Sequence, residues 1–471
     1  MIRDRTSKLI KNTLILGFGQ FLPKVTVLIT LPILTKALTT SEYGIYDLIL
    51  TAESLLIPLM TLQVQQGIFR KLLQKGSIGT KGIISSAYIF LLFSFIIWCP
   101  VLIIIFKYII NYSLPVALII YIVYLGAALF DVLGQTIRGI GYNYKYSIGI
   151  VVYTIMNMLL LVLLYWAQKI SVESVLICMA MSYLVAIGYY IMTEKLYKCV
   201  KKKYFDKLII KDLFAYSLPM IPSSIALWVV NLSDRLFITF FLGTSYNGIY
   251  SIANKIPNLF ASVYAVFNLA WTETAARTMD KDADVDTYYS KMFEIMFQFL
   301  SGAMLLLISI SPIAFRILID SQFDDAFQQM PILFLGVFFN CIVSFYGGIY
   351  VAKQQTKQVG YSSACGAILN AAINILMIRK WGLYAASIST VISFAIIAVY
   401  RGWDLKKYVN IDYNIKKIGW CIISMGLYCI VCSRRNIGFN IIMFIVAIAW
   451  NCMINRNIIK VIAVKRKNEA R

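Results

Sequence analysis

Fourteen apolar segments divide this 471-residue sequence, and each is long enough to cross a lipid bilayer as a helix, which takes about 20 residues. Hydrophobic residues make up 60% of the chain and charged residues only 14%, whereas a soluble domain keeps about a quarter of its residues charged. The sequence therefore predicts an all-α polytopic membrane protein. The expected segments are 12–38, 43–68, 82–107, 114–140, 144–167, 171–196, 213–242, 246–275, 287–318, 328–352, 358–380, 382–402, 413–433 and 438–460.

The distribution of the 44 Lys and Arg residues predicts the orientation of the chain. With the N-terminus placed in the cytoplasm, the cytoplasmic segments hold 33 of them and the outer loops hold 8, as expected for cytoplasmic loops. The other three, Lys24, Arg235 and Lys255, lie within helices. Both termini are therefore expected in the cytoplasm, and the net charge of +22 is attributed to a membrane face rather than to binding of nucleic acid.

A short internal repeat predicts two related halves. Thr40 to Tyr46 reads TSEYGIY and Thr244 to Tyr250 reads TSYNGIY, an offset of 204 residues. Each stretch follows a segment that is expected to enter the membrane from the same side. The sequence thus predicts two parallel six-helix bundles, 1–196 and 213–402, joined by the basic linker 197–212, as in secondary transporters. Residues 403–471 would add two helices and a basic tail.

Several motifs resemble one transporter family. They are the TSEYGIY turn, the LPMIPSS that opens the seventh segment, the N-x-x-D-R of Asn231 to Arg235, and the GIY after Asn247. Together they resemble bacterial polysaccharide transporters of the O-antigen flippase kind, in the multidrug/oligosaccharidyl-lipid/polysaccharide exporter superfamily. The similarity in architecture covers the whole chain, while the motifs cluster near the first, second, seventh and eighth segments.

This resemblance implies a V-shaped pair of six-helix bundles in the bacterial inner membrane. It implies that an undecaprenyl-diphosphate-linked sugar repeat unit moves from the cytoplasmic to the outer leaflet by alternating access. Membrane lipids, a polysaccharide polymerase and chain-length proteins are the partners that such a role implies. No enzyme activity is expected. The chain has no His and no P-loop motif, so neither a metal centre nor ATP hydrolysis is predicted.

Charges inside the membrane are the candidate functional residues, because burying one costs at least about 2.5 to 3.5 kcal/mol. Lys24 lies near the middle of the first segment, where it could meet an anionic substrate or pair with Glu53 of the second. Arg235 and Lys255 suit phosphate by their donors. Asp234, beside Arg235, could instead hold one of these two bases and so tie the seventh and eighth helices together.

Further charges lie in the half of the membrane nearer the cytoplasm. Asp131 and Arg138 are seven residues apart and should share a helix face, as should Glu273 and Arg277, four apart. Arg70, Arg138 and Arg277 could receive a diphosphate from the cytoplasmic leaflet, or act only as interface anchors. A proton or Na⁺ gradient could act through four carboxylates, Glu53, Asp131, Asp234 and Glu273. Glu294 has no evident partner and could join a salt bridge or carry a proton.

Two other functions are open to a polytopic membrane protein of this composition. A multidrug exporter of the same superfamily would share the fold, but cationic drugs need an acidic or aromatic pocket, whereas the charges here are largely basic. A polysaccharide polymerase or glycosyltransferase would need acidic residues outside the membrane. The loops are too short for a domain, and the acidic loop Asp320–Asp325 reads as a solvated turn.

Overall fold

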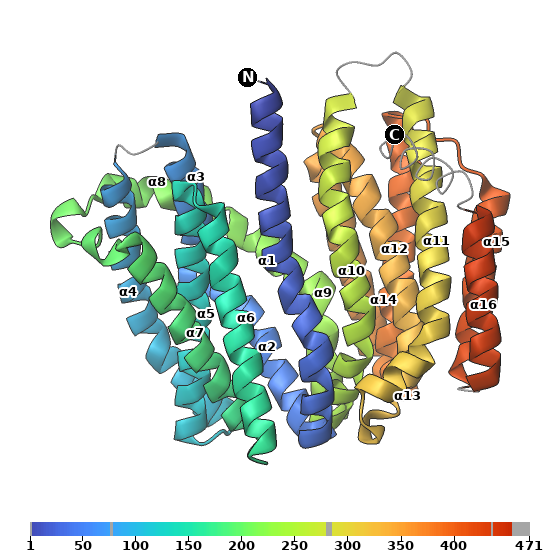
Figure 1. Ribbon diagram of the computed structural model, residues 1–471, viewed down its shortest axis with the longest axis horizontal. Coiled ribbons are helices and arrows are strands. Elements are labelled where there is room, and N and C mark those ends of the chain that lie inside the picture. The colour runs from blue at the N-terminus through green and yellow to red at the C-terminus, as the bar shows by residue number, and fades with distance from the viewer. Residues whose placement is uncertain (1, 76–78, 279–284, 435–436, 455–471) are drawn as a thin grey trace, which may run out of the picture. The chain divides into compact units, whose positions relative to one another are not determined.

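The structure, a computed structural model, describes residues 2–75, 79–278, 285–434 and 437–454 (Figure 1). Over these ranges it contains sixteen α-helices, five short helical turns and no strand. Among the described residues, eleven helical stretches are long and apolar enough to cross a membrane. The prediction of an all-α polytopic membrane protein is confirmed.

The helices follow one another with short connections. They are α1 (Ile2–Ala37), α2 (Thr40–Thr61), α3 (Val64–Lys75), α4 (Thr80–Ile104), α5 (Leu114–Ile140), α6 (Asn143–Trp166), α7 (Val172–Glu194), α8 (Lys207–Ser217), α9 (Met220–Leu242), α10 (Thr244–Thr278), α11 (Val285–Leu318), α12 (Ala326–Ala352), α13 (Thr356–Trp381), α14 (Leu383–Asp404), α15 (Ile415–Ser433) and α16 (Ile437–Ile454). The short turns are η1 (Ile105–Ile109), η2 (Leu196–Lys198), η3 (Lys202–Tyr204), η4 (Ser321–Phe323) and η5 (Leu405–Lys407).

Each of the fourteen predicted segments coincides with one helix or with one interrupted helix. The second segment is broken into α2 and α3, because Leu62 and Gln63 adopt left-handed φ angles of 48° and 56°, a conformation that does not propagate a helix of L-residues. The seventh is broken into α8 and α9 at Pro219, which lacks the N–H that would continue the backbone ladder. The apolar pattern runs through both breaks, so it did not reveal them.

The chain forms two compact units, residues 1–232 and 233–471. The boundary lies within α9, later than the linker 197–212 at which the two bundles were expected to divide. In the first unit α5 packs on α2, α3 and α7, α6 joins α1 to α7, and α8 covers α3 and α4. The linker region therefore belongs structurally to the first unit.

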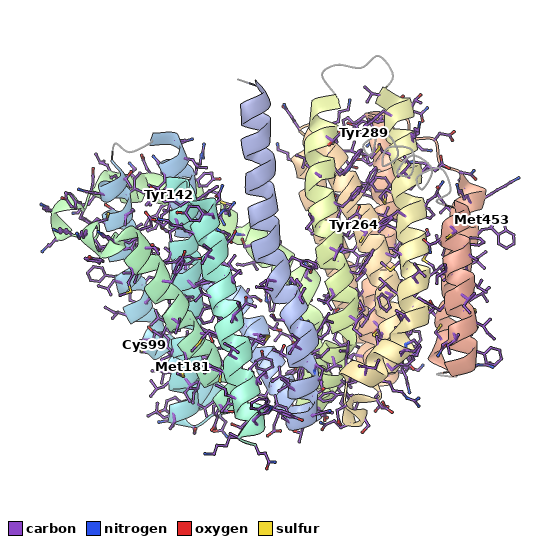
Figure 2. All side chains as sticks on the ribbon, in the orientation of Figure 1. Cys99, Tyr142, Met181, Tyr264, Tyr289 and Met453 are labelled. Carbon is purple, nitrogen blue, oxygen red and sulfur yellow. The ribbon has the colours of Figure 1, made fainter. Side chains whose placement is uncertain are left out.

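The second unit is built around α12, which packs against α10 and α14. Figure 2 shows Tyr264 and Tyr289 among the side chains of this unit, and both rings are buried. The two additional helices α15 and α16 pack on α11, where the Asn451 amide donates to the Gly302 carbonyl at 2.8 Å. A Cβ at Gly302 would collide with that amide, so the glycine permits this close approach.

The repeated stretches occupy corresponding places in the two units. TSEYGIY begins α2 and TSYNGIY begins α10, so each supplies the first two turns of a long helix. At α2 the Thr39 hydroxyl and the Glu42 side chain form a reciprocal capping box, which satisfies backbone donors at the helix start.

Substitution of Gly149 should lower the stability of the first unit. A Cβ at this position of α6 would overlap the ring of Tyr190 on α7. That ring cannot move away easily, because it is buried, stacks on Phe130 and donates to the Tyr146 carbonyl at 2.8 Å. We expect Gly149→Ala to cost about 1 to 3 kcal/mol, seen as a lower melting temperature of the detergent-solubilised protein. Gly188→Ala on α7 is the matched control, since its Cβ would meet nothing within 4 Å. Equal melting temperatures of Gly149→Ala and Gly188→Ala would contradict the close packing of α6 against Tyr190.

Candidate functional site

A cluster of polar side chains surrounds Asp234 in the second unit. Its carboxylate is 8% exposed and accepts three hydrogen bonds: from the Thr390 hydroxyl at 2.8 Å, the Asn374 amide at 2.9 Å and the Tyr250 hydroxyl at 3.0 Å. Asp234 lies on α9, Thr390 on α14, Asn374 on α13 and Tyr250 on α10. The cluster therefore joins four helices through one carboxylate.

The Asn374 amide nitrogen is surrounded by oxygens. Besides Asp234 it lies 3.0 Å from the Asn370 carbonyl, 3.1 Å from the Asn370 side-chain oxygen and 3.0 Å from the Ser389 hydroxyl. An amide nitrogen carries two hydrogens, so four oxygens compete for them. The Asn374 side-chain oxygen is itself buried and has no hydrogen-bond partner among the described residues. The Asn370 amide nitrogen in turn donates to the Ser389 and Thr390 hydroxyls at 3.3 and 3.5 Å. The cluster is thus a connected network of amides and hydroxyls around one carboxylate.

The sequence indicated Asp234 but missed the residues around it. Asn370 and Asn374 are four residues apart and so share one face of α13, while Ser389 and Thr390 on α14 bond back to the Ala386 carbonyl. Two Asn residues at this spacing in an apolar helix were a usable signal. Neutral polar residues are common in membrane helices, however, and do not stand out as a charge does.

The predicted cations of the second unit lie near this cluster in sequence. Arg235 and Lys255 are both half-buried. The suggestion that Asp234 holds one of them, and the suggestion that they bind phosphate, both stay predictions. The side chains of Glu273 and Arg277 lie outside the described residues. Glu294, for which the sequence offered no partner, accepts hydrogen bonds from Lys417 of α15 at 2.9 Å and from Gln298 at 2.7 Å.

In the first unit Glu53 is buried in an aromatic environment. One carboxylate oxygen accepts a hydrogen bond of 3.3 Å from Tyr183, whose ring stacks on Tyr153 with centroids 4.4 Å apart. The other oxygen has no hydrogen-bond partner among the described residues. Lys24 is exposed, and within the described part of the chain no ion pair joins it to Glu53. Pairing with Glu53, one of the two alternatives for Lys24, is therefore not formed in this structure, and contact with an anionic substrate stays a prediction.

The inner charges of the first unit are held by amides and rings. Arg138 donates to Gln135 at 3.0 Å and lies over the Phe69 and Tyr146 rings, 4.8 and 5.1 Å from their centroids. Asp131 lies close to Gln135 and Arg138 on α5. Arg70 lies over the Tyr216 ring at 4.3 Å. Arg70 and Arg138 are therefore both held against aromatic rings at the α3 end of the unit.

Removal of the Asn374 amide should destabilise the second unit. Asn374→Leu would deprive the buried Asp234 carboxylate of one of its three donors, a loss of about 1 to 3 kcal/mol. A lower melting temperature is expected by a thermal-shift measurement in detergent. Asn258→Leu is the control, because Asn258 is exposed on α10. If both variants have the melting temperature of the wild-type protein, the hydrogen bond from Asn374 to Asp234 contributes nothing to stability.

Comparison with known proteins gives both a family and a fold. The sequence pattern of the family described as "Polysaccharide biosynthesis protein" matches residues 9–272. The probable low-salt glycan biosynthesis flippase Agl15 of Haloferax volcanii is 24% identical over 241 residues, which are 49% of this chain and 49% of that protein. The chain thus spans about half the length of this curated relative.

Two solved structures share the fold. The lipid II flippase MurJ in an inward closed conformation has a TM-score of 0.72 and 13% identity, over 95% of this chain and 100% of that one. An outward-facing multidrug resistance MATE family transporter of the MOP superfamily has a TM-score of 0.58 and 12% identity, over 89% of this chain and 96% of that one. The described helices therefore follow the fold that these two structures share.

Proposed function

Because this chain belongs to the polysaccharide biosynthesis protein family, we propose that it is a flippase that carries a lipid-linked oligosaccharide across the cell membrane. The cargo would be an undecaprenyl-diphosphate-linked repeat unit of an O-antigen or capsule, moved from the cytoplasmic to the outer leaflet of a bacterial inner membrane. Both termini would be cytoplasmic. A polysaccharide polymerase and chain-length proteins would act on the product.

One observation carries this proposal beyond the family match. Lys24 is exposed on α1, thirteen residues before the helix ends at Ala37, a distance of about 20 Å along the axis. A lysine at this depth cannot face lipid without a cost of at least about 2.5 kcal/mol. It is better placed in a water-filled cavity that receives an anionic group. The diphosphate of a lipid-linked sugar supplies such a group, whereas a cationic drug would be repelled.

Transport of a lipid-linked sugar by proteoliposomes tests this function. We expect the purified protein to move a fluorescent lipid-linked oligosaccharide between leaflets, and Lys24→Ala to slow the initial rate about tenfold, as for a lost charged hydrogen bond. Lys24→Arg should retain most of the rate, because it preserves the charge. Lys169→Ala, in the exposed turn after α6, is the matched control. Movement of cationic dyes without movement of the sugar lipid would favour a multidrug exporter instead.

Coupling to a cation is the second part of the proposal. The Asp234 cluster offers carboxylate, amide and hydroxyl oxygens in one buried place, and the Asn374 side-chain oxygen there has no hydrogen-bond partner among the described residues. Those oxygens suit Na⁺, and a buried carboxylate can also carry a proton. We infer that ion binding at Asp234 drives the transport cycle, with Asn370 and Thr390 as further oxygen ligands.

Neutralising Asp234 should uncouple transport from the ion gradient. In proteoliposomes we expect an inward Na⁺ gradient to accelerate the wild-type protein several-fold, and Asp234→Asn to abolish that acceleration. Asp325→Asn is the control, since Asp325 lies in the exposed turn before α12. A response to a pH gradient alone, lost in the same variant, would assign the site to protons. Unchanged stimulation of Asp234→Asn by both gradients would refute coupling at this cluster.

A further inference from the structure

A surface cavity of about 300 Å³ lies between α3 and α8 in the first unit, where the two short helices pack against each other (Figure 1). It is lined by Gly67, Arg70, Lys71, Gln74, Asp212, Ala215 and Tyr216. The helix α3 has 12 residues and α8 has 11, and α8 forms the start of the apolar stretch Lys207–Ala226, which is long enough to cross a membrane.

Close packing at Gly67 fixes one wall of this cavity. A Cβ at Gly67 would lie 2.7 Å from the Ser217 hydroxyl and 3.1 Å from Leu213, so any larger residue would push α8 away from α3. Ser217 and Leu213 are buried at this contact. The polar side chains of the two helices are thereby held at a defined spacing.

Arg70 is oriented by the aromatic ring of Tyr216. Its guanidinium carbon lies 4.3 Å from the ring centroid, the arrangement of a cation over an aromatic face. A ring that covers the guanidinium plane leaves the N–H groups at its edge able to donate in a fork. This fork matches the oxygens of a phosphate, which a lysine can bind only as a point charge.

Lys71 forms an ion pair with Asp212 that a more highly charged anion can replace. Its ammonium lies 2.7 Å from the Asp212 carboxylate, with side chains 22% and 58% exposed. An ion pair this accessible contributes at most about 1 kcal/mol. A diphosphate carries more charge than one carboxylate, so it can take the place of Asp212 at little cost.

The surroundings of the cavity attract anions. The chain from Lys195 to Asp212 contains seven Lys and only two Asp. This segment includes the first residues of α8 and ends at Asp212, which lines the cavity. Such an excess of one sign raises the local concentration of oppositely charged groups at a membrane surface.

We propose that the α3–α8 cavity is a loading site for the diphosphate of the lipid substrate, with Arg70 and Lys71 as phosphate donors and Asp212 as the counter-ion that the diphosphate replaces. This inference rests on the proposed function, which supplies a diphosphate lipid as cargo. It adds a place where the head group binds before it crosses the membrane, separate from the helix-embedded Lys24.

Binding of farnesyl diphosphate to the full-length protein in phosphatidylcholine nanodiscs tests the site. Arg70→Gln and Lys71→Gln should each weaken binding about tenfold, as expected for loss of a charge-assisted hydrogen bond. Asp212→Asn should tighten binding, because it removes the competing carboxylate. Lys81→Gln is the matched control: Lys81 also lies over a ring, that of Tyr204 at 5.7 Å, but it does not line the cavity. Melting temperatures verify that the variants fold.

The outcomes separate a loading site from its alternatives. Inorganic pyrophosphate should compete with farnesyl diphosphate, and replacing phosphatidylcholine by phosphatidylglycerol should leave binding intact. If phosphatidylglycerol abolishes binding, the cavity holds ordinary anionic lipid and the proposal is overturned. It is equally overturned if Lys71→Gln and Asp212→Asn lower only the melting temperature, as a structural ion pair would. If Arg70→Gln binds farnesyl diphosphate normally while the protein still transports the sugar lipid, this site alone is refuted. If the wild-type protein neither binds farnesyl diphosphate nor transports the sugar lipid, the proposed function is refuted.

Discussion

The hydrogen bonds to the Asp234 carboxylate join four helices of the second unit of this protein. A buried carboxylate away from water must be satisfied by other groups of the chain, and Tyr250, Asn374 and Thr390 do so from three different helices. These bonds fix the facing sides of α9, α10, α13 and α14. The Asn370 amide extends the same network to the Ser389 and Thr390 hydroxyls.

The first unit contains the same repeat, but its buried Glu53 carboxylate has another hydrogen-bond partner. Tyr46 and Tyr250 are equivalent positions of the repeated stretches, yet the residue 204 positions before Asp234 is Thr30. Thr30 bonds to its own helix at the Thr26 carbonyl. Asp47 and Glu53 are both buried in this unit, and Glu53 receives one tyrosine hydroxyl. The two halves therefore keep a common order of helices while only one of them builds an oxygen-rich cluster.

Charged residues within the long helices differ from those on the short helices α3 and α8. Helix-embedded groups such as Lys24 are costly in lipid and therefore indicate a hydrated path. Groups on the short helices α3 and α8 are accessible and exchange partners cheaply. The first unit thus carries exposed cations both within a long helix, at Lys24, and on a short one, at Arg70.

Much of the fold followed from the sequence, because a bilayer of fixed thickness requires apolar helices of fixed length. Hydropathy predicted the apolar helices, of which eleven stretches among the described residues are long enough to cross a membrane, and a charge in an apolar run was enough to single out Asp234. The breaks at Leu62–Gln63 and Pro219 were missed, since an apolar pattern continues across a change in backbone direction. Asn374 and Thr390 were missed as well, as they lie 140 and 156 residues from Asp234. Local composition could identify which residues are unusual in a membrane. Only tertiary packing decided which of them meet, because that depends on how distant helices face one another.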